Sequence, residues 1–258
     1  MFKFAFAILF IFSLASQGHA ALVKKVIDYK DGSTPLAGYL VYNDSVKGLR
    51  PGILVVHNWM GITDETKSKA DALAGLGYTV FAADIYGKDV HPKDTNEAGA
   101  LAGKYKADRL LLRKRVTAGL TTLEKQKDVD AKRIAAMGYC FGGTTALELG
   151  RSGAALNSIV TFHAGLDSPT PADGKNIKAK VLVLHGADDP YNKADDVKAF
   201  QDEMRNSKID WQMVEYGGAV HSFTEKAAGY DNSKGAAYNA SADKRSWQAM
   251  VDFIKETL

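Results

Sequence analysis

The sequence has a single cysteine, Cys140, among its 258 residues. One cysteine cannot form a disulfide within its own chain, so a stabilising bridge is excluded. Three interpretations of the thiol stay open: an inert buried side chain, an intermolecular link or a reactive nucleophile.

The chain also lacks an excess of charge of either sign. It has 33 Lys and Arg against 30 Asp and Glu, a net charge of +3, and the two signs are mixed along the sequence. This balance gives no basis for binding nucleic acid or an anionic membrane surface. Internal repeats, low-complexity tracts and linkers are absent as well. We therefore expect one domain that acts on a small molecule and needs no cofactor.

Long apolar runs are missing outside the N-terminus. There, Lys3 precedes the apolar run Phe4–Leu14, which is shorter than the roughly 20 residues of a membrane span. Gly18-His19-Ala20 then places small residues at both positions that a signal peptidase reads before Ala21. The pattern predicts a cleavable signal peptide at 1–20 and one mature domain at 21–258, periplasmic or secreted and not membrane-bound; an uncleaved anchor is the alternative. A reactive thiol exported to that compartment would be exposed to oxidation.

Short apolar runs alternate with helix-like segments along the mature chain. The predicted strands are Val23–Tyr29, Leu36–Tyr42, Ile53–His57, Thr79–Ala83, Ile134–Met137, Ser158–Phe162, Val181–Leu184 and Trp211–Tyr216. The first predicted helix starts at Thr63 or Asp64 and runs to Leu76. The other predicted helices are Asn96–Tyr105, Ala107–Lys125, Thr144–Gly150, Asp195–Asn206 and Ala242–Leu258. This alternation is typical of an α/β protein whose mostly parallel central sheet is covered by helices on both faces. Ligand sites in such sheets lie at the carboxyl ends of the strands.

Cys140 follows one of these predicted strands directly. It sits in Gly138-Tyr139-Cys140-Phe141-Gly142-Gly143, between an apolar run and a helix-like stretch. This is the G-x-S-x-G nucleophile elbow with sulfur in place of oxygen, in which the positions two before and two after the nucleophile must lack bulk. The start of a helix also favours the thiolate form of a cysteine. The pattern favours the nucleophile among the three interpretations.

Two further loops supply the partners that such a nucleophile needs. Asp188 and Asp189 follow the strand Val181–Leu184, and His221 follows the strand Trp211–Tyr216. The chain order of nucleophile, acid and histidine is that of α/β-hydrolases. The histidine would take the proton of the thiol and later protonate the leaving group, while the carboxylate fixes its tautomer. Asp188 has an alternative role as a cap of the following helix.

From Ala37 to the C-terminal helix, the chain resembles the dienelactone hydrolase family, α/β-hydrolases that carry a cysteine nucleophile. The stretches that carry the resemblance are Val55-Val56-His57-Asn58-Trp59-Met60-Gly61, Gly77-Tyr78, Ala83-Asp84-Ile85-Tyr86-Gly87, the elbow, His185-Gly186-Ala187-Asp188-Asp189-Pro190 and His221-Ser222-Phe223. The resemblance implies an α/β-hydrolase fold with Cys140, Asp189 and His221 as catalytic residues. Asp189 is preferred to Asp188 because the family's acid precedes a Pro-aromatic pair, here Pro190-Tyr191.

The expected activity is hydrolysis of an ester, thioester or lactone through an acyl-cysteine. The backbone N–H groups of Phe141 and Trp59 are the expected oxyanion hole. Further residues are expected to bind substrate or shape the pocket: His57, Asn58, Tyr86, Lys88, His163, Tyr191 and Phe223. The histidines show no metal-ligand spacing, so no metal site is expected. The sequence is compatible with a monomer or a small homo-oligomer.

Three positions depart from the family's pattern. Asn58 stands where the family has a glutamate that can take the thiol's proton, and an amide cannot do this. Lys88 and Glu225 stand where founding members have arginines that hold the lactone carboxylate, and Glu225 would repel such a group. Dienelactone itself is therefore not the expected substrate. The alternative function is a catalytically degenerate hydrolase that binds a small acyl or lactone ligand.

Overall fold

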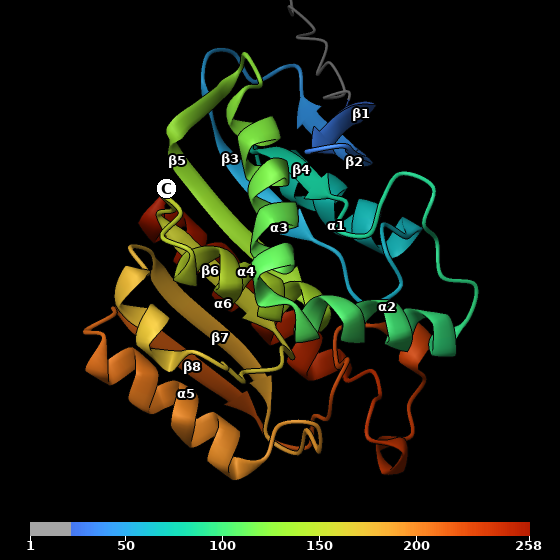
Figure 1. The fold of residues 1–258 in the computed structure, drawn as a ribbon, viewed down its shortest axis with the longest axis vertical. Helices are drawn as coiled ribbons and strands as arrows, with labels where there is room; N and C mark the ends of the chain where they lie inside the picture. Colours follow the sequence, from blue (N-terminus) through green and yellow to red (C-terminus); the bar gives the residue numbers. More distant parts are fainter. Residues whose placement is uncertain (1–21) are drawn as a thin grey trace, which may run out of the picture.

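The computed structural model describes residues 22–258. The predicted signal peptide at 1–20 lies outside these residues. The centre of the molecule is an eight-stranded sheet in the order β1-β2-β4-β3-β5-β6-β7-β8 (Figure 1). Its strands are β1 Leu22–Asp31, β2 Thr34–Asn43, β3 Arg50–Val56, β4 Thr79–Ala83, β5 Val129–Tyr139, β6 Ser158–Phe162, β7 Lys180–Gly186 and β8 Trp211–Tyr216.

The strands from β3 to β8 are parallel, and the hairpin of β1 and β2 joins β4 in antiparallel fashion. Every residue of β4 and β6 is buried, as expected for strands covered on both faces. All eight predicted strands are present. β5 begins at Val129, earlier than predicted, because its first residues pair with Arg50 and Pro51 before a register shift.

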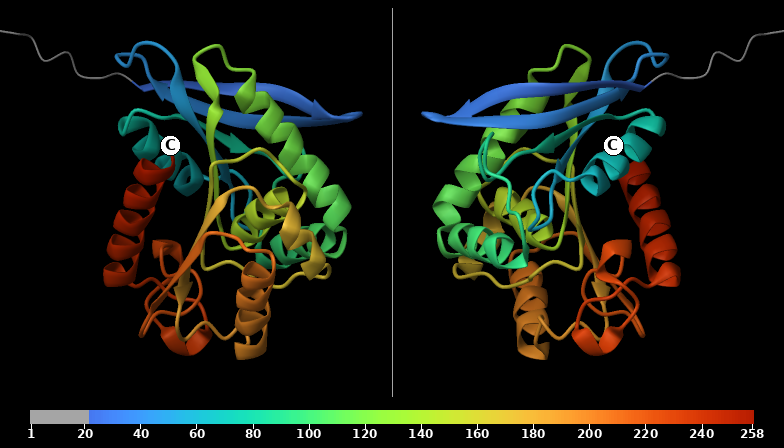
Figure 2. Two further views of the ribbon diagram at one scale, coloured as in Figure 1. Left: turned by 90° about the vertical axis from the view of Figure 1, so that its left-hand side faces the viewer. Right: turned by 90° about the vertical axis from the view of Figure 1, so that its right-hand side faces the viewer.

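Helices cover both faces of this sheet (Figure 2). They are α1 Asp64–Gly75, α2 Thr95–Ala107, α3 Arg109–Glu124, α4 Phe141–Arg151, α5 Ala194–Asn206 and α6 Ala240–Thr257. One core cluster packs α1 and α6 against one face, and the other packs α3, α4 and α5 against the opposite face. Three short 3₁₀ turns, Pro171–Asn176, Lys226–Ala228 and Asn232–Lys234, were not predicted. The predicted α/β-hydrolase architecture is thus confirmed.

The turn from β5 into α4 is as crowded as the elbow pattern requires. Cys140 itself has φ 54° and ψ −117°, a left-handed value that strains a residue with a side chain. A Cβ on Gly138 would lie 2.1 Å from the Gly142 carbonyl, and one on Gly142 would lie 2.2 Å from the Val56 oxygen. Neither position has room for a side chain, so the two glycines allow strand and helix to approach.

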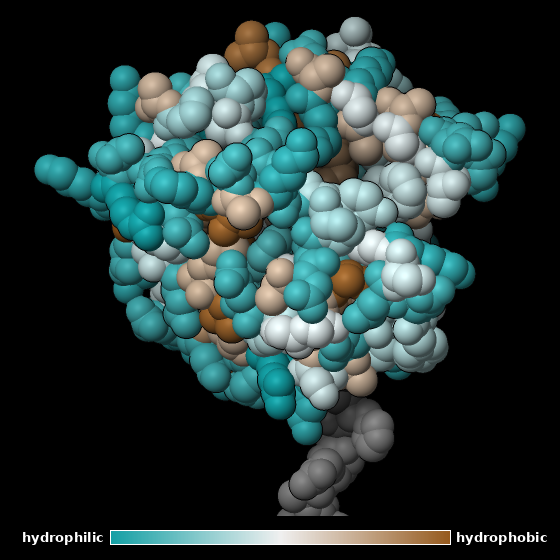
Figure 3. All heavy atoms as spheres, turned by 90° about the horizontal axis from the view of Figure 1, so that it is seen from below, coloured by the Kyte–Doolittle hydropathy of each residue, from teal (hydrophilic) through white to brown (hydrophobic). Residues whose placement is uncertain are grey.

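The surface on the lower side of Figure 1 is mostly hydrophilic, with small apolar spots separated by polar side chains (Figure 3). Within residues 22–258, no helix combines the length and the apolar character that crossing a bilayer requires.

Candidate active site

The fold brings three loops at the carboxyl ends of β5, β7 and β8 into contact. Cys140 Sγ lies 3.0 Å from His221 Nε2, and His221 Nδ1 lies 2.8 Å from Asp189 Oδ2. The contacts link three residues that are 32 to 81 positions apart in the sequence. This is the nucleophile–base–acid geometry in which one imidazole nitrogen faces the nucleophile and the other faces its orienting carboxylate.

The charges of this trio reinforce one another. Burial lowers the pKa of His221, but the hydrogen bonds and charges of Asp189 and Cys140 outweigh burial and raise it to about 10. Burial raises the pKa of Asp189, and this is more than offset by its hydrogen bond to His221, which holds the pKa below its usual range. At neutral pH, His221 is therefore an imidazolium between a carboxylate and the sulfur of Cys140.

Asp189 is held by the loop that contains it. Its Oδ1 accepts a hydrogen bond from the Tyr191 N–H at 2.9 Å, and its Oδ2 accepts one from Asn192 Nδ2 at 3.3 Å. Asp188 instead accepts a hydrogen bond from the Gly218 N–H at 3.0 Å. Its alternative role as a helix cap is wrong, because α5 begins later, with Lys193 as its N-cap. Asp188 ties the loop after β7 to the loop after β8, and Asp189 faces the histidine.

The loop after β3 carries the predicted oxyanion donor of Trp59. Ile85 N–H donates to His57 Nε2 at 3.2 Å, so the proton of this imidazole is on Nδ1, which donates to the Asn58 carbonyl at 2.6 Å. Tyr86 Oη donates to the Trp59 carbonyl at 2.9 Å. Within residues 22–258, the N–H groups of Trp59 and Phe141 donate to no protein acceptor. Both donors are thus free for a substrate oxygen.

A cavity of about 630 Å³ lies over Cys140. It is lined by five residues that the sequence singled out and by others that it did not: Trp59, Cys140, Phe141, Tyr191 and His221, together with Gly99, Ala102, Gly103, Lys106, Thr144, Gly165, Asp167, Asn192, Asp196, Ser222 and Ala236. Gly99, Ala102, Gly103 and Lys106, which the sequence did not single out, belong to α2 and form one side of the cavity. Sequence spacing predicted that helix but carried no signal that it would lie over the cysteine.

Four of the predicted pocket residues lie beneath the cavity and do not line it. His57, Tyr86, His163 and Phe223 are buried in the core. His163 Nε2 lies 2.9 Å from Thr224 Oγ1, and burial holds the pKa of this imidazole well below its ordinary value. These side chains support the loops around the cavity and leave the contact with a ligand to other residues.

The three positions that depart from the family's pattern also lie outside the cavity lining. Lys88 forms an exposed ion pair with Asp28 at 2.6 Å, so its predicted place in the pocket is wrong. Asn58 Nδ2 donates to Glu225 Oε1 at 2.9 Å, and Asn58 Oδ1 accepts from the Met60 N–H. Glu225 is buried, accepts this hydrogen bond from Asn58 and does not line the cavity.

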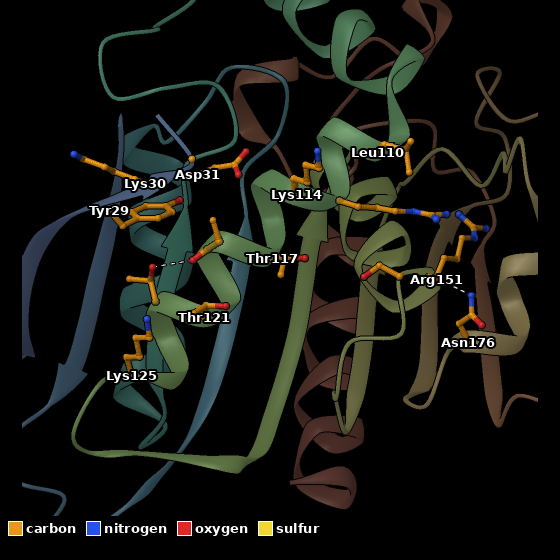
Figure 4. A pocket seen from close by; sticks show the side chains of 15 residues that line it. Tyr29, Lys30, Asp31, Leu110, Lys114, Thr117, Thr121, Lys125, Arg151 and Asn176 are labelled. Atoms are coloured by element: carbon orange, nitrogen blue, oxygen red, sulfur yellow. Dashed lines mark hydrogen bonds between the residues drawn. The ribbon is translucent and has the colours of Figure 1, made fainter. Parts of the chain in front are cut away.

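A second hollow of about 710 Å³ runs along α3, lined by residues of the β1–β2 turn, of α3 and of the end of α4 (Figure 4). It contains neither a cysteine nor a histidine. Its two arginines are paired with carboxylates: Arg113 with Glu148 and Asp173, and Arg151 with Glu148 and Glu203. Volume alone would have favoured this groove, but the reactive groups are in the other cavity.

Comparisons with known proteins agree with this geometry. The profile of the "Dienelactone hydrolase family" matches residues 36–258. The crystal structure of a "Dienelactone Hydrolase-like Promiscuous Phosphotriesterase P91 from Metagenomic Libraries" is 41% identical with a TM-score of 0.87, over 92% of this chain and 99% of that one. An uncharacterized protein of Caenorhabditis elegans is 33% identical over 56% of this chain and 93% of its own length. A probable 2-oxo-3-(5-oxofuran-2-ylidene)propanoate lactonase of a Bradyrhizobium species is 27% identical over 81% of this chain and 85% of its own.

Proposed function

Because the chain belongs to the dienelactone hydrolase family, hydrolases of ester and lactone bonds, we propose that it cleaves such bonds through an acyl-cysteine formed on Cys140. The observation that carries the proposal is the continuous contact from Cys140 Sγ through His221 to Asp189, at 3.0 and 2.8 Å. We also propose that the chain is exported, as its N-terminal sequence suggests.

The reaction starts from the thiolate and the imidazolium. The sulfur attacks the carbonyl carbon, a C–S bond forms, and the carbonyl electrons move onto oxygen. The N–H groups of Trp59 and Phe141 stabilise this oxyanion as it develops. When the carbonyl re-forms, the C–O bond of the ester breaks, and His221 Nε2 gives its proton to the departing alkoxide.

Water then releases the acyl group. His221, now neutral, takes a proton from a water molecule as the water oxygen attacks the thioester carbonyl. The C–S bond breaks, the carboxylic acid leaves, and the thiolate–imidazolium pair is restored. Asp189 stays ionised throughout and keeps the imidazole in the tautomer with a proton on Nδ1.

This scheme does not need a carboxylate beside the thiol. Asn58 bonds Glu225 and the Met60 N–H, and His221 Nε2 lies within hydrogen-bond distance of the sulfur. In this proposal His221, and not a carboxylate at position 58, activates the thiol before substrate arrives. The departure at position 58 removes a proton acceptor that a preformed ion pair makes unnecessary.

A panel of para-nitrophenyl esters, thioesters and lactones tests the proposal on the mature chain. Wild type should turn over at least the esters, and Cys140→Ala should not. The panel includes a neutral phosphotriester, since the relative of 41% identity is described as a promiscuous phosphotriesterase. Equal, slow hydrolysis by both proteins would refute the proposal. Tight binding without turnover, together with poor alkylation of Cys140, would favour the degenerate ligand-binding protein instead.

A further inference from the structure

The cavity over Cys140 has two unlike walls. Tyr191, Ser222 and Ala236 lie beside His221 and form one wall, whereas Trp59 lies beside Gly99 and, with Ala102 and Gly103, forms the α2 wall. Tyr191 packs edge-on against the His221 ring with centroids 5.2 Å apart. If the proposed function holds, the leaving oxygen must face His221, which protonates it. The leaving group then lies along the Tyr191 wall and the acyl group along the α2 wall.

The α2 wall contains two glycines whose presence the fold does not require. Gly99 and Gly103 are four residues apart in the helix Thr95–Ala107 and so share a face. Each interior glycine costs a helix about 1 kcal/mol relative to alanine. Neither residue has a positive φ, so the backbone conformation does not demand glycine.

Packing does not demand glycine at these positions either. A Cβ on Gly103 would have no heavy atom within 4 Å, and one on Gly99 would meet the Trp59 ring at 3.8 Å, an ordinary contact. In contrast, a Cβ on Gly138 would overlap the Gly142 backbone. The glycines of the elbow are needed for the fold, but those of α2 are exposed where they line the cavity and leave open space at its mouth.

The charges around this space are already paired. Besides His221, which is held by Asp189, Lys106 is the basic residue of the lining, and its Nζ lies 3.8 Å from Asp167 Oδ1. The other oxygen of Asp167 bonds Arg109 at 2.6 Å, and Asp196 adds a second carboxylate to the lining. A negatively charged acyl group on this side of the cavity would meet Asp167 and Asp196, and the cations near it, Lys106 and Arg109, are already paired with Asp167. An uncharged group meets no such opposition.

We propose that Gly103, with Gly99 beside it, determines the acyl specificity of this enzyme and makes room for a bulky, uncharged, apolar acyl group. The indole of Trp59, which lies beside Gly99, offers an apolar surface in the same cavity that suits an aromatic ring. The proposal rests on the proposed function and adds to it the class of acyl group and the wall that accepts it.

Gly103→Leu fills the space, and Ala100→Leu is the matched control, since Ala100 is exposed on the same helix and does not line the cavity. Both variants are assayed with para-nitrophenyl acetate and para-nitrophenyl phenylacetate, which share a leaving group. Gly103→Leu should lower kcat/KM for phenylacetate relative to acetate by about tenfold or more, as expected when a pocket loses the volume of several methylenes. Ala100→Leu should leave that ratio unchanged.

A second series varies the leaving group at constant acyl group, with phenyl acetate and 2-naphthyl acetate. Gly103→Leu should not change this ratio, because the α2 wall does not face the leaving group. Leucine is a better helix former than glycine, so the melting temperature of Gly103→Leu should not fall; Gly103→Ala provides a smaller substitution in the same direction. An unchanged acyl ratio, or equal losses on both acyl esters, would overturn the inference. Failure of wild type to hydrolyse any ester would instead overturn the proposed function.

Discussion

Two of the hollows in residues 22–258, the groove along α3 and the cavity over Cys140, are similar in size and differ in chemistry. The groove along α3 has about 710 Å³ and the cavity over Cys140 about 630 Å³. In the groove, the two arginines, Arg113 and Arg151, are paired with carboxylates of the protein itself. In the cavity, Cys140 and its partner His221 both line the open space. The comparison shows that the reactive side chains in the lining, and not the volume of a hollow, identify the active site.

The largest difference between the two hollows should appear in turnover. His221→Gln removes the proton carrier of the cavity and should lower kcat/KM for a para-nitrophenyl ester by about 10⁴-fold. Lys114→Gln, in the lining of the groove, should change kcat/KM less than about twofold. Steady-state kinetics on both variants makes the test. A loss in Lys114→Gln that matches the loss in His221→Gln would show that the groove takes part in the reaction.

Alkylation of Cys140 by iodoacetamide sharpens the same contrast without a substrate. In wild type, the charge on His221, whose pKa is raised to about 10, should favour attack by the sulfur at pH 7. In His221→Gln, the thiol loses this partner and should be alkylated about tenfold or more slowly at pH 7. Equal alkylation rates for the two proteins at pH 7 would contradict the ion pair.

Substitutions beside the groove should change the free energy of unfolding, whereas substitutions in the cavity should change the catalytic rate. The Arg151 side chain is fully buried and bonds Glu203 at 2.6 Å and Glu148 at 3.0 Å. Arg151→Leu leaves a buried carboxylate without its partner and should lower the free energy of unfolding by about 3–5 kcal/mol. Adding Glu203→Leu should recover part of this loss, because Glu148 keeps Arg113 at 2.8 Å. Urea unfolding measures both effects; kcat per folded molecule should stay unchanged.

The smallest expected effect is a loss of stability in mild acid. Burial lowers the pKa of His57 and of His163 in the folded state, so below about pH 6.5 the unfolded chain binds more protons than the folded one. Stability should therefore fall from pH 6.5 toward pH 5, by at most about 1.4 kcal/mol per pH unit for each histidine. His221 does not make stability depend on pH in this window. The stability that its raised pKa contributes is fully present below pH 6.5 and is lost only as the pH rises toward about 10.

His163→Asn separates this effect from general acid sensitivity. Asparagine tolerates the positive φ of 39° at this position and does not titrate. Melting temperatures at pH 7 and pH 5 should differ less for the variant than for wild type. Equal differences in the two proteins would mean that His163 is not kept neutral by the fold.

The sequence predicted the elements of this fold well because their signals are local. Each short apolar run and each capped helix is specified by its own residues, and the elbow glycines were readable because no other residue fits so close to Val56 and Gly142. The order of Cys140, Asp189 and His221, each after a strand, was readable for the same reason: parallel strands bring their carboxyl ends to one edge.

Predictions from the sequence failed where the answer depends on a contact between distant segments. Lys88 reaches Asp28, sixty positions away, and Asn58 reaches Glu225. Neither pairing has a sequence signal. The position of α2 over the cysteine was hidden for the same reason, so its glycines had no visible function. His163 was placed in the pocket because it follows a strand, and Phe223 because it is aromatic, but burial beneath the cavity is decided by side-chain direction.

The most direct test of the account is the mass of the enzyme during turnover. Wild type mixed with para-nitrophenyl phenylacetate and quenched in acid within milliseconds should gain the mass of one acyl group, located on the peptide that contains Cys140. Cys140→Ala should gain none. Turnover by wild type without any acylated Cys140, or equal acylation of the Cys140→Ala variant, would contradict the claim that this thiol is the nucleophile.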